Sequence, residues 1–146
     1  MVSTAEQQAP PLPEYATLAT TFTGALGAFV LLAGDRLPAR IGFGDLARVA
    51  LAGYKLGRLV AKDEVTRFVR APVTQDEEAS EPEPEGWRRA LGELVTCPHC
   101  VGLWISAGLV SSLVVLPRQT RFVATVFGAQ AIADFLNAGF VKLRDA

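Results

Sequence analysis

Uncharged apolar stretches alternate with short charged segments along this chain. Residues 15–34 carry no charge over twenty positions, which is the length a helix needs to cross the hydrocarbon core of a bilayer. Residues 98–116 form a second uncharged stretch, and residues 122–141 are nearly as apolar. This pattern predicts an all-α, polytopic membrane protein with three transmembrane helices. A buried helix of a soluble protein is the less favoured interpretation of residues 15–34, because two similar stretches follow.

A further helix, residues 45–70, combines an apolar face with a basic one. Asp45 is predicted to cap it, and its apolar residues recur at helical spacing. On a helical wheel one narrow face carries Arg48, Lys55, Arg58 and Lys62. A basic amphipathic helix of this kind lies against anionic lipid, so we expect these side chains to contact lipid headgroups. The alternatives are a solvated face packed on a partner, or a fourth transmembrane helix over residues 43–61.

Two polar segments interrupt the apolar pattern. Residues 1–14 contain three prolines and little periodicity, which predicts a flexible tail. Residues 74–86 hold six acids and two prolines and cannot bury a core, so we expect a disordered linker. We therefore predict a single helical membrane domain over residues 15–146, interrupted by this linker.

The distribution of charge predicts the topology. The net charge of −1 gives no reason to expect a nucleic-acid partner. With three transmembrane helices, twelve of the fourteen Lys and Arg fall on one side, which the positive-inside rule assigns to the cytoplasm. We expect a multi-pass plasma-membrane protein with its N-terminus outside and its C-terminus in the cytoplasm. With four transmembrane helices both termini are inside, and in either topology Cys97 and Cys100 face the cytoplasm.

Both cysteines and the single histidine lie in residues 96–104, TCPHCVGLW. Pro98 suits the first turn of a helix, which makes Cys97 the N-cap. A helix N-terminus favours the thiolate, and Cys-Pro-His-Cys matches the dithiol of thioredoxin-like oxidants. Such oxidants need surrounding strands, and membrane thiol oxidoreductases use a second cysteine pair, so we favour two buried thiols that pack the helix start. Redox chemistry at Cys97 and Cys100 is the alternative.

Metal binding is a further alternative for the same segment. A structural zinc site takes four ligands, and His99, between the two cysteines, is not expected to join them on one ion. Two copies of the chain meeting here would supply four thiolates, so zinc across a dimer is conceivable. We predict no catalytic residue, no cofactor and no firm metal site within one chain.

The last apolar helix carries a polar face. Gln130, Asp134 and Asn137 are spaced so that they lie together, and in lipid such a face turns inward. We expect Asp134 to pair with Arg58, Lys55 or His99, as a buried structural pair rather than as a proton or ion site. In an oligomer this face would instead line a water path, as in a holin-like pore.

Two motifs resemble those of a known family. The motifs are Thr96-Cys97-Pro98-x-Cys100-x-Gly102-x-Trp104 and Asp63-x-x-Thr66-x-x-x-Arg70-x-Pro72. Together they resemble a family of small bacterial integral membrane proteins of unknown function, over about residues 43–141. The resemblance implies a polytopic membrane protein, and some members of that family are labelled as sporulation or phage-associated proteins. It implies no reaction and no catalytic residue.

From these observations we expect a small, non-enzymatic membrane protein that acts as an accessory or assembly-forming component. Its partners are the lipid bilayer and either further copies of itself or other membrane proteins. A thiol-redox or metal-binding protein and a pore-forming oligomer are the alternatives. We also expect Arg70 to meet the start of the motif helix near Thr96.

Overall fold

The structure, a computed structural model, describes residues 12–74 and 86–145. Within these residues every element is a helix, which agrees with the predicted all-α class. The α-helices are α1 (Leu12–Ala33), α2 (Phe43–Lys62), α3 (Arg67–Arg70), α4 (Gly86–Thr96), α5 (Pro98–Val115) and α6 (Pro117–Arg144). By length and composition α1, α5 and α6 could each cross a membrane, as the three apolar stretches predicted.

The predicted tail and linker fall largely outside the described residues. Of the tail, residues 12–14 are described, and they form the first turn of α1 rather than irregular chain. Of the linker, only its two end residues are described. Gly86 begins α4 with a φ of 63°, a left-handed conformation that glycine adopts without steric cost.

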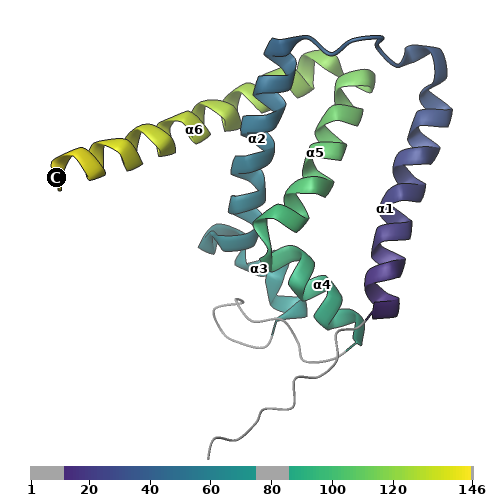
Figure 1. Ribbon diagram of the computed structural model, residues 1–146, viewed down its shortest axis with the longest axis horizontal. Coiled ribbons are helices and arrows are strands. Elements are labelled where there is room, and N and C mark those ends of the chain that lie inside the picture. Colours follow the sequence, from purple (N-terminus) through teal and green to yellow (C-terminus); the bar gives the residue numbers. More distant parts are fainter. Residues whose placement is uncertain (1–11, 75–85, 146) are drawn as a thin grey trace, which may run out of the picture.

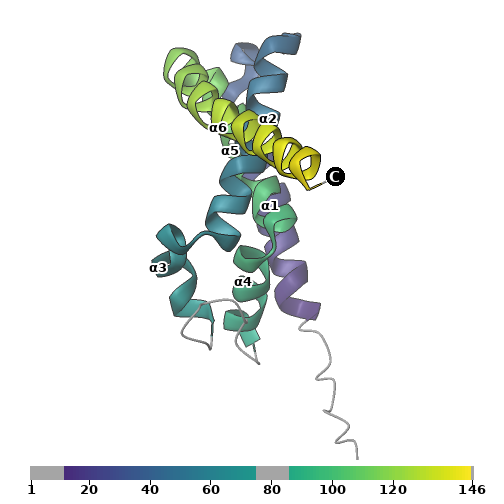
Figure 2. The same cartoon turned by 90° about the vertical axis from the view of Figure 1, so that its left-hand side faces the viewer.

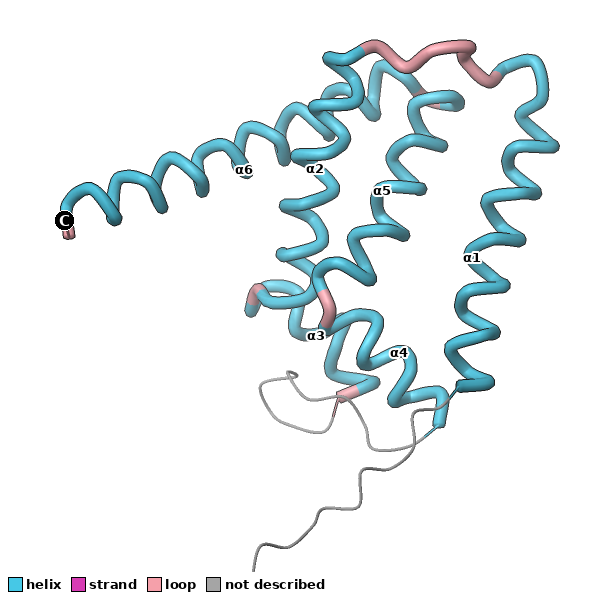
Figure 3. Tube along the Cα trace, in the orientation of Figure 1, coloured by secondary structure: helices cyan, strands magenta, loops and turns pink. Residues whose placement is uncertain are grey.

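In chain order α1, α2 and α5 alternate in direction, and in space α5 lies between α2 and α1 (Figure 1). The chain crosses from α1 to α2 at one end of this layer, through the loop that Figure 3 shows in pink. Helices α3 and α4 lie at the opposite end, where α2 finishes and α5 begins. The motif segment is therefore at the end that holds α3 and α4.

Helix α2 is the centre of the fold because it packs against both α5 and α6. Its buried residues are Val49, Ala52, Gly53, Gly57 and Ala61. They recur at helical spacing and are mostly small, so neighbouring helices approach closely, as membrane helices do at their interfaces. A Cβ atom on Gly57 would lie 2.8 Å from the carbonyl oxygen of Pro98 and 3.2 Å from the Cα atom of Gly102.

Helix α6 leaves the end of α5 at a wide angle and crosses α2 (Figures 1 and 2). Residues 117–121 are the first residues of α6, which starts directly at Pro117, so α5 and α6 form a wide corner and not an antiparallel hairpin (Figure 1). Its buried positions Ala124, Gly128 and Ala131 form a small-residue face. A Cβ atom on Gly128 would lie 3.5 Å from the Cβ atom of Leu51, so this face packs on α2 instead of α5.

Both predicted ends of α2 need correction. Gly42, in an extended conformation, is the N-cap, and no side-chain hydrogen bond caps this end of the helix. Asp45, which we predicted as the cap, lies in the first turn. The helix stops at Lys62 instead of continuing to Arg70, because Asp63 is extended, with ψ of 143°. A short 3₁₀ turn and α3 then follow.

Helix α1 has few contacts with the rest of the molecule. Its ring contact is Phe22 with Trp104 of α5, edge to face with centroids 5.0 Å apart. Near its first turn, the Tyr15 hydroxyl donates a hydrogen bond to the Glu93 carboxylate of α4. Four threonine hydroxyls, those of Thr17, Thr20, Thr21 and Thr23, return to carbonyls one turn earlier. These bonds satisfy the polar groups that a lipid-exposed helix would otherwise leave unpaired.

Candidate functional site

The two thiols lie next to each other at the junction of α4 and α5. Cys97 is the N-cap of α5, and its sulfur accepts a hydrogen bond from the backbone N–H of Cys100 at 3.3 Å. The Cys100 thiol donates to the same sulfur, with 2.7 Å between the two Sγ atoms. Both cysteines are free thiols. The predicted N-cap is observed, and it places the pair within reach of a disulfide after a small change in side-chain rotation.

The surroundings of Cys97 favour its thiolate. The hydrogen bond from the Cys100 thiol is the largest cause that lowers the pKa of Cys97, and partial burial opposes it. Backbone N–H groups of Cys100 and His99 and the positive charge of Lys62 lower this pKa further. Donors converging on one sulfur at a helix start are the usual means by which a protein activates a thiol.

The thiols are more exposed than we predicted. Cys100 is exposed and Cys97 is of intermediate burial, so the interpretation of both as buried packing residues is wrong. The packing at this junction is instead between backbones, where Gly57 of α2 meets Pro98 and Gly102 of α5. In the described part of the chain no third His, Cys, Asp or Glu joins the pair in a possible metal cluster.

The second motif forms a clamp on the end of α2. The Arg70 side chain is buried, and its Nη1 donates to the carbonyl oxygens of Val60 at 2.8 Å and Asp63 at 3.0 Å. The Thr66 hydroxyl donates to the carbonyls of Asp63, at 3.0 Å, and Leu59. These side chains satisfy carbonyls that the last turn of a helix leaves without partners, which accounts for Asp63, Thr66 and Arg70 as structural residues.

The clamp is tied to the dithiol end through α4. Arg88 donates from Nη2 to the carbonyl oxygen of Pro72 at 2.6 Å. Thr96 caps the other end of α4 by donating to Gly92 at 2.7 Å. The expected contact of Arg70 with the start of α5 near Thr96 stays a prediction, and the observed connection from this motif to α4 runs through Pro72 and Arg88.

A second hydrogen-bonded group on α4 involves Glu93. Arg89 donates from Nε to the Glu93 carboxylate at 3.0 Å, and Tyr15 binds the same carboxylate from α1. Burial raises the pKa of Glu93, but the hydrogen bonds from Tyr15 and Arg89 outweigh it and leave this pKa lowered. Glu93 and Tyr15 were not predicted from the sequence, because helical spacing relates only residues that are near each other in the chain.

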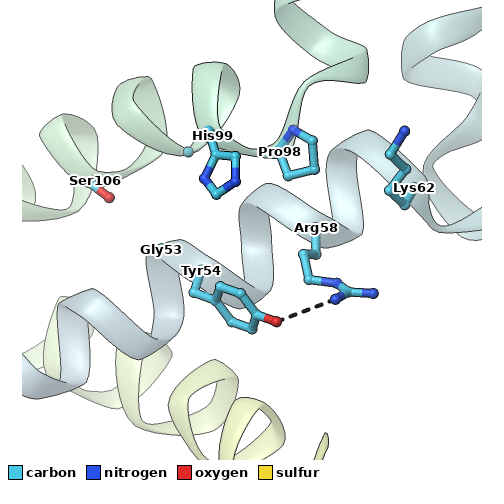
Figure 4. A pocket seen from close by; sticks show the side chains of 8 residues that line it. Gly53, Tyr54, Arg58, Lys62, Pro98, His99 and Ser106 are labelled. Carbon is cyan, nitrogen blue, oxygen red and sulfur yellow. Dashed lines mark hydrogen bonds between the residues drawn. The ribbon is translucent and has the colours of Figure 1, made fainter. Parts of the chain in front are cut away.

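A cavity of about 700 Å³ opens between α2 and α5 beside the dithiol segment. It is lined by Gly53, Tyr54, Arg58, Lys62, Pro98, His99, Gly102 and Ser106. Figure 4 shows Arg58 and Tyr54 together on α2, opposite Pro98 and His99 of α5. Arg58 donates to the Tyr54 hydroxyl at 3.3 Å. The fold brings Lys62, the last residue of α2, and His99 of the first motif to one cavity.

The four basic residues of α2 separate into two pairs. Arg48 binds Asp45 at 2.8 Å, and Asp45 also binds Arg121 of α6 at 2.9 Å. Lys55 binds Asp134 of α6 at 2.7 Å, which is one of the partners predicted for Asp134. Arg58 and Lys62 instead line the cavity. Contact of all four residues with lipid headgroups stays a prediction. Two of them, Arg48 and Lys55, have carboxylate partners within the protein.

Only part of the polar face of α6 makes side-chain contacts. Gln130 donates from Nε2 to the second oxygen of Asp134 at 3.4 Å, so Asp134 is held from both helices. Asn137 is exposed. Tyr54 stacks on Phe135 beside this pair, with ring centroids 5.3 Å apart. Lys55, Asp134 and the two rings together hold α6 on α2.

Comparison with known proteins gives a family without an assigned function. Residues 49–140 match the model of the family described as protein of unknown function (DUF1360). The chain is also similar to the UPF0713 protein YngL of Bacillus subtilis (strain 168), with 28% identity over 114 residues, covering 73% of this chain and 88% of the relative. No solved structure gives a significant match. Both motifs lie within the matched residues.

Proposed function

Because the chain belongs to the DUF1360 family, whose function is unknown, we propose its function from the site itself: a multi-pass membrane protein whose Cys97–Cys100 dithiol exchanges with disulfides of a partner protein. The observation that carries this proposal is the 2.7 Å approach of the two free sulfurs at the start of α5. Exposure of Cys100 gives a partner access to the pair.

The exchange balances as a two-electron transfer. The Cys97 thiolate attacks one sulfur of the partner disulfide, and the other partner sulfur leaves as a thiolate and takes a proton from water. Cys100 then loses its proton and attacks the Cys97 sulfur, which releases the second partner thiol. The products are a Cys97–Cys100 disulfide and a reduced partner. Small-molecule thiols in the surrounding compartment would return the pair to its reduced form.

We further propose a topology with four transmembrane helices, the alternative among our predictions. The change of direction from α1 to α2 and from α2 to α5 supports it, and so does the position of α2, which runs alongside α5 rather than across its end (Figure 1). Seven basic residues then fall on the dithiol side, against Arg36, Arg40, Arg118 and Arg121 on the other. By the positive-inside rule the dithiol side is cytoplasmic, a reducing compartment that suits a dithiol acting as a reductant.

A redox titration of the purified protein tests the exchange. The protein is equilibrated with mixtures of reduced and oxidised dithiothreitol, and free thiols are counted by alkylation and mass spectrometry. We expect an intramolecular disulfide that forms reversibly in a monomer, and none in Cys97→Ser or Cys100→Ser. Failure to form this disulfide at any ratio contradicts the proposal. If the protein instead retains one zinc ion per two chains and its thiols are protected from alkylation, the thiol-exchange proposal would be replaced by zinc binding across a dimer.

The pH dependence of alkylation gives a second test. The lowered pKa of Cys97 predicts that its alkylation rises at lower pH than that of an unfolded cysteine, whose pKa is about 8.5. Cys100→Ala removes the donating thiol and moves the profile to higher pH, whereas Cys100→Ser retains a donor and moves it less. Because the folded-state pKa is depressed, the thiolate stabilises the fold above the unfolded pKa, and this contribution is lost as pH falls through the folded value. Identical profiles for the two variants would contradict a role for the Cys100 hydrogen bond.

The expected assembly-forming role stays a prediction. It has support from α1, where a Cβ atom on Gly24 or Gly27 would meet nothing within 4 Å, so a second copy of the helix could approach closely. The pore alternative has less support, because Lys55 neutralises Asp134 on the face that would line the water path. Cross-linking of Gly27→Cys, in a variant without Cys97 and Cys100, tests the assembly-forming role. We expect a cross-linked dimer that persists when the protein is diluted with lipid.

A further inference from the structure

We propose that the cavity between α2 and α5 binds a phosphate-bearing anion, with Arg58, Lys62 and His99 as its polar ligands. The cavity has a volume of about 700 Å³, enough for a phosphate group together with the glycerol portion of a phospholipid. Among the described residues, its lining carries two permanent cations and no carboxylate. A cavity of this composition selects an anion.

The pairing of charges on α2 supports this site independently. Four basic residues share one face of the helix, and the two outside the cavity, Arg48 and Lys55, each bind a carboxylate. Among the described residues, no Asp or Glu forms an ion pair with Arg58 or Lys62. These are the two cations that line the cavity. In the part of the chain that the structure describes, carboxylates therefore bind the first two cations directly, whereas Asp63 and Asp134 act on Arg58 only through longer-range attraction and leave its N–H donors for a ligand.

The donors in the cavity suit phosphate. Arg58 uses one N–H to reach the Tyr54 hydroxyl at 3.3 Å, and a guanidinium carries five such donors. The Arg58 guanidinium also lies 6.0 Å from the centroid of the Tyr54 ring, which restricts where it points. Lys62 and His99 add donors from the two sides of the cavity (Figure 4). A planar guanidinium with a nearby ammonium is a common arrangement for phosphate recognition.

The remaining lining indicates how a longer ligand would lie. Gly53 and Gly102 place bare backbone along the cavity, and Ser106 lies one to two turns further along α5 than His99. The charged end is at Lys62, the last residue of α2. In the proposed topology this end is at the membrane surface and the Ser106 end is within the bilayer. An anionic phospholipid headgroup and free phosphate share the required chemistry, and the two arms of the experiment distinguish them.

The experiment counts bound anions on the intact protein. In the lipid arm, protein in nanodiscs of phosphatidylcholine containing a minor fraction of phosphatidylglycerol is released into native mass spectrometry, and retained phosphatidylglycerol is counted. In the second arm, the same protein in phosphatidylcholine alone is titrated with inorganic phosphate and followed by ³¹P NMR. Retention of phosphatidylglycerol identifies a headgroup site, and saturable binding in the second arm identifies a site for free phosphate.

The decisive variant is Arg58→Gln/Lys62→Gln. We expect it to lose binding at least roughly tenfold, since charge-assisted hydrogen bonds are the stronger class. Its matched control is Arg40→Gln/Arg118→Gln, which removes two exposed cations at the other end of α2. Arg58→Lys/Lys62→Arg keeps both charges and should retain most of the binding, which separates loss of ligands from failure to fold.

Two results would overturn the site. One is equal retention by the cavity variant and its control, which would mean only general attraction of anionic lipid to basic protein. The other is binding in neither arm by the unchanged protein. The site does not depend on thiol exchange, because its readout is bound lipid or phosphate. If the anion does bind, it should also raise the pH at which Cys97 is alkylated, since Lys62 is among the groups that lower the pKa of Cys97.

Discussion

Helices α1 and α2 show opposite relations between composition and position. Helix α1 is apolar apart from Glu14, yet none of its residues is buried in the structure. Helix α2 carries a basic stripe and acidic and aromatic residues, yet it contains Val49, Ala52 and Ala61, half of the buried hydrophobic residues. A long helix with a single charged residue is thus peripheral, and a helix with four cations is central.

This difference is what a lipid environment would produce. Large apolar side chains are already well solvated by lipid tails, so they gain little from packing against other helices. Small residues and paired polar groups gain more, because close backbones improve van der Waals contact and an unpaired charge is costly in lipid. Helix α2 has both, with Gly53 and Gly57 toward α5 and Lys55 toward Asp134 on α6.

The largest expected effect is at the ion pair that holds α6 on α2. The side chain of Lys55 is 16% exposed and that of Asp134 is 43% exposed. Lys55→Met leaves the Asp134 carboxylate without its cation, and we expect a loss of stability larger than that of the glycine variants below, because an uncompensated charge is costly where little water reaches it. Reversible unfolding in mixed micelles measures this loss.

The double variant Lys55→Met/Asp134→Leu is the control for that measurement. Removal of both charges should recover most of the stability, because no uncompensated group remains. Equal destabilisation by the single and double variants would mean that the pair contributes through shape and not through charge. Helix α2 would then owe its central position to its small residues alone.

The next largest effect on stability is expected at the small-residue face of α2. In Gly57→Ala the new Cβ atom would lie 2.8 Å from the carbonyl oxygen of Pro98, so α2 and α5 must move apart. Overpacking of this kind costs roughly 1–3 kcal/mol, partly offset by about 0.5–1 kcal/mol from the better helix propensity of alanine. We expect a net loss of about 1–2 kcal/mol, measured as in the preceding test.

Two other glycines at the same interface grade this effect. A Cβ atom on Gly53 would meet the Ser106 hydroxyl at 2.6 Å, a side-chain atom that can rotate away, and one on Gly102 would meet nothing closer than 4.0 Å. The expected order of destabilisation is Gly57→Ala, then Gly53→Ala, then Gly102→Ala. An effect at Gly102 as large as that at Gly57 would contradict the interface geometry.

Much of this architecture was predictable from the sequence, because it depends on local pattern. The uncharged stretches gave α1, α5 and α6, and Pro98 gave the start of α5 with Cys97 as its N-cap. The pairing of Asp134 with Lys55 was one of three options, since an acid in an apolar helix requires a cation nearby.

The remainder depended on contacts between distant residues. The basic stripe of α2 was interpreted as facing headgroups because the partner of Lys55, Asp134, could not be assigned without the crossing of α6 over α2. The end of α2 was misplaced because Arg70 folds back onto the carbonyls of Val60 and Asp63. The cavity combines residues of α2 with residues of the Thr96–Trp104 motif on α5, and neither segment alone carries a signature of it.

The smallest expected effect is on α1. Gly27→Ala adds a Cβ atom with nothing within 4 Å, so no packing is lost and the helix gains about 0.5–1 kcal/mol in propensity. We expect unchanged or slightly higher stability of the monomer in excess lipid, assessed by thermal unfolding of the purified protein. A clear loss would show that α1 is packed more closely than its contacts with α4 and α5 indicate.

The central claim is that α2 crosses the same layer as α1 and α5, and the sidedness of its two ends tests it most directly. In a variant without Cys97 and Cys100, single cysteines are introduced as Arg40→Cys before α2 and Glu64→Cys after it, and intact cells and inverted vesicles are treated with a membrane-impermeant thiol reagent. The fold predicts labelling of Arg40→Cys from the outside and of Glu64→Cys from the cytoplasmic side. Labelling of both from the cytoplasmic side would place α2 on the membrane surface and contradict its central position.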